Sequence, residues 1–169
     1  MREENVVAIS VDSGHEKQVV RDVLDLLFPY DVEVRVTGVS RGRVSLVTRI
    51  PAEDLRRIFR RYPVRHILKV KLLRKVLPLS SEVAQTLREI VSFFLEEGVK
   101  IRRISVRLEK VEGWSQSAYS LLMRELRTNG LLDSGGLLYA VETDGQAVFV
   151  FEVLFTRNPR VHSPTGLTP

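Results

Sequence analysis

Residues 60–82 read RRYPVRHILKVKLLRKVLPLSSE, and three segments of different periodicity follow one another in this stretch. The first two residues end a run with helical spacing, and Pro63 stops it because proline lacks the N–H that a helix needs. Apolar and basic residues then alternate with the period of two that is typical of a half-buried strand. Pro78 interrupts this strand, and Ser80 and Ser81 precede another helical pattern as N-cap residues do. We therefore expect a helix, a strand and the start of a new helix.

The residues before this stretch alternate between the same two periods. Ser13 and Glu16 have the spacing of a capping box, with Ser13 as the N-cap. In chain order the patterns predict a strand at 6–11, a helix from 13–16 to about 28, a hairpin of strands 32–36 and 44–50, a helix at 51–62 and a strand at 66–72. This order is the split βαβ plan of a ferredoxin-like half.

The residues after the serine pair predict a second half of mixed structure. The patterns give a helix from 81 to Gly98, a strand at 103–108, a helix from 115 or 117 to about 127, a loop at 131–138 and two strands at 139–142 and 146–154. We therefore expect an α/β (α+β) protein in which a βαββαβ half precedes an αβαββ half. The expected domains are residues 1–77 and 78–155, and the proline-containing segment 156–169 is expected to be a disordered tail.

Positive charge is concentrated in one segment of the chain. Residues 55–75 contain no Asp or Glu but hold nine basic residues: Arg56, Arg57, Arg60, Arg61, Arg65, Lys69, Lys71, Arg74 and Lys75. The rest of the chain has 17 basic against 21 acidic residues. A local excess of this kind is typical of proteins that bind a polyanion, because like charges repel one another unless a partner neutralises them. A solvated helix face is the alternative that the charge leaves open.

The composition argues against metal sites and membrane spans. The chain has no cysteine, and its three histidines are scattered, so neither a disulfide nor a metal is expected. No apolar run approaches the roughly 18 residues of a membrane span, and no signal peptide is visible, so we expect a cytoplasmic protein. The 20 Arg against 6 Lys and only seven Asn and Gln hint at a thermophile.

The chain lacks the common catalytic and nucleotide-binding motifs, and no cofactor is expected. Residues 134–136, SGG, resemble a phosphate loop, but without a following lysine they predict a plain loop. His15 and His66 could each act as a general base, but neither has a nucleophile near it in sequence, so structural roles are favoured. We therefore expect no catalytic residue and a protein that is not an enzyme.

Three patterns resemble the THUMP domain together with its N-terminal ferredoxin-like companion. They are VRLEK at 106–110 before a serine-containing helix start at 115–117, YAVETDGQAVFV at 139–150, and the basic strand with its Leu-Pro exit within 60–78. The last of these is similar to the non-catalytic tRNA-acetylation adaptors of the family. The resemblance covers residues 1 to about 155.

The resemblance implies binding of structured RNA, mainly tRNA. It suggests an adaptor that presents tRNA to a separate modification enzyme, with a tRNA cytidine acetyltransferase as the candidate, because only about 15 residues follow Leu154. The expected RNA-binding residues are Arg56, Arg57, Arg60, Arg61, Arg65, Lys69, Lys71, Arg74, Lys75, Arg103, Arg107 and Lys110. Two other functions stay open: a protein-interaction or small-ligand regulatory module, and an enzyme whose catalytic groups converge from distant positions.

Overall fold

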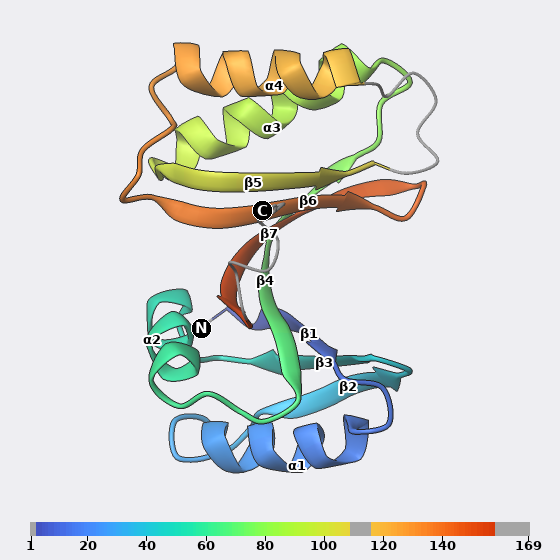
Figure 1. Ribbon diagram of the computed structural model, residues 1–169, viewed down its shortest axis with the longest axis vertical. Helices are drawn as coiled ribbons and strands as arrows, with labels where there is room; N and C mark the ends of the chain where they lie inside the picture. The colour runs from blue at the N-terminus through green and yellow to red at the C-terminus, as the bar shows by residue number, and fades with distance from the viewer. Residues whose placement is uncertain (1–2, 109–115, 158–169) are drawn as a thin grey trace, which may run out of the picture. The chain divides into compact units, whose positions relative to one another are not determined.

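The computed structural model describes residues 3–108 and 116–157, which form seven strands and four helices (Figure 1). The first elements are β1 (Asn5–Val11), α1 (Glu16–Leu27), β2 (Arg35–Ser40), β3 (Arg43–Thr48), α2 (Ala52–Arg61) and β4 (Ile67–Pro78). The later elements are α3 (Val83–Glu97), β5 (Ile101–Arg107), α4 (Gln116–Thr128), β6 (Leu137–Thr143) and β7 (Ala147–Thr156). This order confirms the predicted mixed α/β class, with a βαββαβ half followed by an αβαββ half.

Packing divides the described chain into two compact units. The first contains residues 3–72 together with 153–157, and the second contains 73–152 apart from the gap at 109–115. Strands β4 and β7 thus each begin in one unit and end in the other. Independent folding of residues 1–77 and 78–155 stays a prediction. Of the expected tail, Thr156 ends β7, and residues 158–169 lie outside the described residues.

The first unit is a sheet with one helix-covered face. Its strands are ordered β2-β3-β1-β4, and each neighbouring pair is antiparallel. The end of β7 lies beside β4, where the Arg157 N–H donates to the Leu68 carbonyl at 2.9 Å. Ile9 of β1, Leu46 of β3 and Phe59 of α2 belong to one buried cluster, to which α1 also contributes. Alternate strand residues therefore face the two helices.

The second unit is built around β6. This strand pairs with β5 in parallel and with β7 in antiparallel orientation. Figure 1 shows α3 and α4 on the same side of these strands. Phe94 of α3 is fully buried and meets Tyr139 of β6 edge to face, with ring centroids 4.8 Å apart. Leu122 of α4 completes the same cluster. The apolar face of each helix thus packs on the apolar, inward-facing residues of the strands.

Two details of the first unit differ from the sequence predictions. The first hairpin strand begins at Arg35 instead of residue 32, because the Asp31 carboxylate accepts the Glu33 N–H at 2.9 Å and forms a turn there. Ser13 is not the N-cap of α1. His15 holds that position. The Glu16 carboxylate instead accepts the N–H of Gly14 and the N–H of Gly42, which lies in the turn between β2 and β3. A side chain can thus accept hydrogen bonds from the backbone N–H groups of a loop without capping the helix.

The N-cap predicted for the next domain is also wrong. Glu82, not one of the serines, is the N-cap residue of α3, and no side chain caps this helix. The Ser80 hydroxyl instead accepts the Glu82 N–H at 3.2 Å and forms a turn before the helix begins. Gly98 ends α3 with a left-handed φ of 66°, as predicted, because glycine adopts this conformation without steric cost.

Candidate nucleic-acid interface

Helix α2 turns an arginine-rich face to solvent. Its apolar residues Leu55, Ile58 and Phe59 are buried at 0–2% exposure. Because a helix repeats every 3.6 residues, the four arginines of α2 fall on the opposite side. Acidic residues occupy the first turn and arginines the last, which suits the helix dipole at both ends. The sequence therefore builds a stable helix whose outer face is basic.

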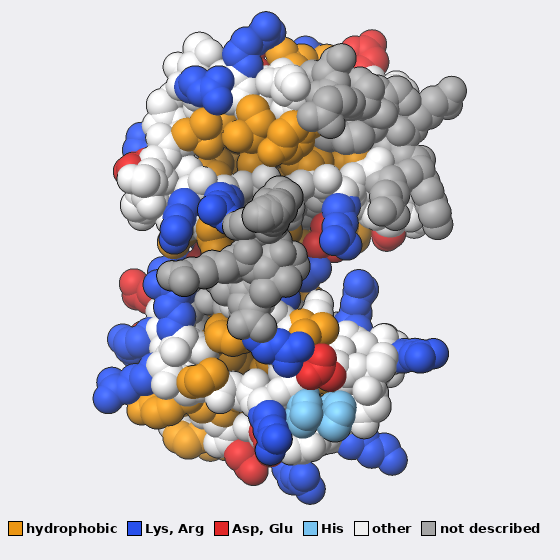
Figure 2. Space-filling view, in the orientation of Figure 1, with side chains coloured by type: hydrophobic (Ala, Val, Ile, Leu, Met, Phe, Trp, Pro, Cys, Tyr) orange, Lys and Arg blue, Asp and Glu red, His pale blue; other side chains and the backbone are white. Residues whose placement is uncertain are grey.

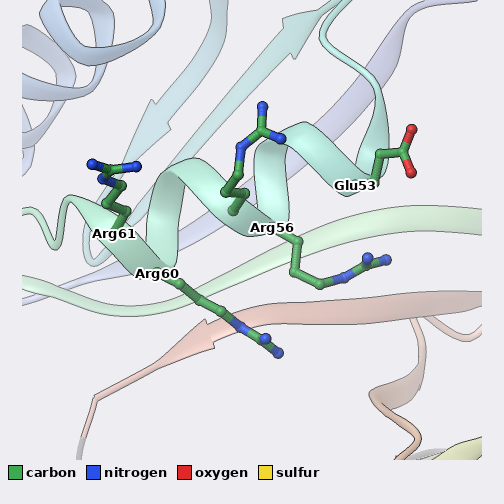
Figure 3. Close-up of a pocket in the computed structure, with 5 residues that line it drawn as sticks. Glu53, Arg56, Arg60 and Arg61 are labelled. Atoms are coloured by element: carbon green, nitrogen blue, oxygen red, sulfur yellow. The ribbon is translucent and has the colours of Figure 1, made fainter.

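The arginines of α2 line a shallow hollow of about 380 Å³ (Figure 3). Figure 3 shows the guanidinium groups of Arg56, Arg60 and Arg61 pointing away from the helix. Arg57 and Glu53 complete the lining. Several guanidinium groups around one hollow present a fan of N–H donors, the geometry that phosphate oxygens accept.

The four arginines differ in exposure and in how far the protein already neutralises them. Arg56 is half-buried. Arg57 is ion-paired with Asp54 at 2.8 Å, one turn earlier on the same helix. The guanidinium carbon of Arg61 lies 5.6 Å from the centre of the Tyr62 ring, within cation–π range. Arg60 is exposed and has no ion-pair partner among the residues that the structure describes. Arg60 and Arg61 are therefore the cations of α2 best placed to meet an anionic ligand.

Strand β4 offers less positive surface than its sequence pattern suggested. The alternation was read correctly, since Val70 and Leu72 face the core at 0% exposure. The opposite face is not open, however: Lys71 is only 7% exposed, and Lys69 is half-buried. Arg65, in the turn before the strand, is exposed. Most of Lys71 is thus unavailable to a large ligand, and its role in RNA binding stays a prediction.

The remaining expected contacts lie in the second unit. Arg74 is ion-paired with Glu97 of α3 at 2.8 Å, while Lys75 is exposed. Arg103 and Arg107 are exposed on β5. Arg102 is exposed as well and was missed, because the strand predicted from the sequence began at residue 103, whereas β5 begins at Ile101. Lys110 lies outside the described residues.

A second polar cluster joins residues that are distant in sequence. The rings of His15 and His66 stack with centroids 3.6 Å apart and an interplanar angle of 10°. His66 Nδ1 lies 3.3 Å from an Asp12 carboxylate oxygen, and Arg157 donates two hydrogen bonds to the same carboxylate. The Arg157 hydrogen bonds are the main cause of the lowered pKa of Asp12. Figure 2 shows the pale-blue imidazoles at the surface.

This cluster is better explained as a structural tie than as a catalytic site. None of the described residues that these contacts join, Asp12, His15, His66 and Arg157, is a Ser, Thr or Lys nucleophile. The Asp12 charge is already neutralised by Arg157. His66 has a φ of 71°, a conformation that non-glycine residues rarely adopt, and its carbonyl accepts the Asp12 N–H at 2.9 Å. The bonds link the loop after β1, the turn before β4 and the end of β7. The cluster could not be predicted from the sequence because no local signal connects these segments.

The glycine loop is also structural. A Cβ atom on Gly136 would lie 2.6 Å from the carbonyl carbon and oxygen of Lys100, so only glycine fits there. The neighbouring Leu137 N–H donates to that carbonyl oxygen at 2.9 Å. The loop thus serves the close approach of β6 to β5 and agrees with the plain loop predicted from the sequence.

Within 3–108 and 116–157, no three His, Cys, Asp or Glu side chains gather in a way that could hold a metal ion. None of the helices in these ranges combines the length and the apolar character needed to cross a bilayer.

Comparison with known proteins gives similarity in fold. No family model and no curated protein matches the chain. A predicted N6-adenine-specific DNA methylase from Listeria monocytogenes superposes with a TM-score of 0.59 at 12% identity, covering 89% of this chain and 40% of the methylase. TrmN from Thermus thermophilus gives 0.55 at 19% identity, with coverages of 92% and 46%. SMU.472, described as a candidate methyltransferase in complex with SAH, gives 0.60 at 10% identity, with coverages of 90% and 42%.

These neighbours contradict the expectation that the protein is not an enzyme. A predicted DNA methylase and a candidate methyltransferase contain the same fold over about nine-tenths of this chain. The chain spans less than half the length of each neighbour, so the residues that perform a reaction can lie outside the matched part. The absence of catalytic motifs from this sequence therefore does not argue against an enzyme, and that inference was wrong.

Proposed function

We propose that this chain binds structured RNA, tRNA in particular, and holds it for modification. The observation that carries the proposal is the arginine face of α2, with Arg60 and Arg61 exposed around a hollow and the core residues of the helix turned inward. The resemblance to THUMP domains suggests that the polyanion bound by this face is RNA. The observed βαββαβ and αβαββ order supports that resemblance.

The chemistry of the arginine face suits RNA. A-form RNA has a major groove too narrow for side chains, so proteins recognise it through its shape, phosphates and 2′-hydroxyls. A guanidinium group donates two parallel hydrogen bonds to one phosphate, and a helix anchored by three buried residues holds such groups rigidly. Binding of this kind releases counterions, and its affinity must fall as salt concentration rises.

The reaction that we propose for the bound RNA is methyl transfer. The sequence hypothesis named a separate acetyltransferase, but the structural neighbours include a predicted DNA methylase and a candidate methyltransferase, which favour methylation. In this proposal the chain supplies the substrate-holding part of the modification machinery, acting in the cytoplasm. Two exposed arginines of β5, Arg103 and Arg107, would add contacts from the second unit.

A salt titration of tRNA binding tests the proposal. The R60Q variant should bind more weakly than wild type, and the slope of log affinity against log salt should fall by about 1 because one phosphate contact is lost. The matched control is R21Q, which removes the same charge from an exposed position on α1 of the same unit. Equal binding of tRNA and duplex DNA, or equal losses in R60Q and R21Q, would overturn the proposal.

A further inference from the structure

Tyr62 is an exposed aromatic residue at the end of the arginine-rich helix. It is 46% exposed, although its N–H still closes the last turn by donating to the Ile58 carbonyl at 2.9 Å. Its φ of −124° and ψ of 76° leave the helical region, and Pro63 follows directly. The backbone under the ring is therefore held from both sides while much of the side chain stays open to solvent.

Positive charge surrounds this ring. Arg61 lies 5.6 Å from the ring centre, and Arg61 also lines the hollow of α2 together with Arg60. An exposed aromatic ring beside cations is the arrangement that binds unpaired nucleotides, because the cations hold the backbone while the ring stacks on a base. Stacking of this kind needs a base with a free face, which the interior of a duplex does not provide.

Tyr30 shows that exposure alone does not make such a site. It is 50% exposed and lies in the same unit, in a hollow of about 470 Å³. That hollow is lined by three carboxylates, those of Asp31, Glu33 and Asp54. Its two arginines are already ion-paired: Arg49 with Glu33 at 3.0 Å and Arg57 with Asp54 at 2.8 Å. Charge complementarity to RNA therefore distinguishes Tyr62 from Tyr30.

We propose that Tyr62 is a stacking platform for an unpaired base of the RNA whose backbone binds α2. The proposal rests on the proposed RNA-binding function and narrows its substrate class to RNA in which a helical stem adjoins a single-stranded segment. The arginines hold the phosphates, and Tyr62 adds affinity that depends on a base being free. A blunt duplex would be bound only through its phosphates, without the stacking contribution of Tyr62.

The test compares two RNAs with the same stem, one blunt and one with a single-stranded 3′ tail. Wild-type protein should prefer the tailed RNA. Y62L should lose roughly 5- to 150-fold in affinity for the tailed RNA, the range that corresponds to one base stacked on an aromatic ring, and keep its affinity for the blunt one. The salt slope should not change, since no phosphate contact is removed. Y62F should bind like wild type, and so should the matched control Y30L.

The outcomes separate this inference from the proposed function. If Y62L binds the tailed RNA as tightly as wild type while R60Q still lowers the salt slope, Tyr62 is not a stacking platform and RNA binding stands. The same conclusion follows if Y62L keeps its affinity for both RNAs and loses only the binding of a protein partner. If neither RNA binds wild-type protein with a salt slope, the proposed function itself fails. A thermal unfolding curve for Y62L checks that this variant is folded, and wild-type binding by Y62F would show that the ring and not the hydroxyl group is responsible.

Discussion

Arg157 donates two hydrogen bonds of 3.1 Å to the carboxylate of Asp12, joining the end of β7 to the loop after β1. Its backbone N–H also donates to the Leu68 carbonyl of β4. Two residues separated by almost the whole chain thus meet in one small cluster, which includes the stacked pair of His15 and His66. The first unit is therefore completed by residues that follow the second unit in sequence.

The Asp12 interaction predicts a specific dependence of stability on pH. The Arg157 hydrogen bonds lower the pKa of Asp12 in the folded protein, with a smaller contribution from His66. A lowered pKa stabilises the fold above the ordinary value of about 3.9, and the stabilisation is lost as the pH falls through the folded pKa. We expect D12N to unfold at a lower temperature than wild type at pH 7, with the difference shrinking below about pH 4.

Thermal unfolding followed between pH 2 and pH 7 measures this difference. R157Q should behave like D12N because it removes the other partner of the same bonds. D25N, which changes an exposed carboxyl group on α1, is the matched control and should follow the wild-type curve. If the gap between D12N and wild type stays constant across the whole pH range, the Asp12 charge does not contribute in this way.

Gly136 and Gly135 make a matched pair for the glycine loop. A Cβ on Gly136 would meet the Lys100 backbone at 2.6 Å, whereas nothing lies within 4 Å of a Cβ on Gly135. G136A should therefore displace β6 from β5 and destabilise the protein by more than about 1 kcal/mol, while G135A should be nearly neutral. Urea unfolding measures both. Equal stability of the two variants would show that the loop can shift without cost.

The sequence predicted the elements but not what joins them. Period-two and period-3.6 patterns placed every strand and helix in the right order, because each pattern is local and reflects one buried face. The Asp12 and Arg157 contact has no such pattern, since it depends on how distant segments meet. Alternation likewise placed Lys71 on the face opposite the core. It could not show that other parts of the protein cover Lys71 there and leave it only 7% exposed.

The candidate site follows the same division. Helical spacing alone predicted that Arg60 and Arg61 would be exposed on α2, and they are. The ion pairs that neutralise Arg57 and Arg74 were not predicted. The i,i+3 spacing of Asp54 and Arg57 could have revealed the first pair. Arg74 and Glu97 come from different elements, and only the packing of α3 brings them together.

Phe94 is expected to dominate the core of the second unit. It is fully buried and packs edge to face on Tyr139. F94A should lower the free energy of unfolding by about 3–5 kcal/mol, the range for truncating a buried phenylalanine. F28A applies the same truncation at a position that is 41% exposed and should cost less than about 1 kcal/mol. Urea denaturation gives both values, and similar losses would contradict the assignment of Phe94 to the core.

Thr86 offers a stabilising substitution. It is 1% exposed within α3, and its hydroxyl oxygen has no hydrogen-bond partner among the described residues. Burying a polar group without a partner costs about 1–3 kcal/mol, and valine replaces the hydroxyl with a methyl group of similar size and the same β-branching. T86V should therefore raise the free energy of unfolding by about 1 kcal/mol. T86A removes the hydroxyl and the methyl group together and leaves a cavity, so it should be less stable than T86V. A loss of stability in T86V would mean that the hydroxyl donates a hydrogen bond in solution, for example to a carbonyl of the preceding helical turn.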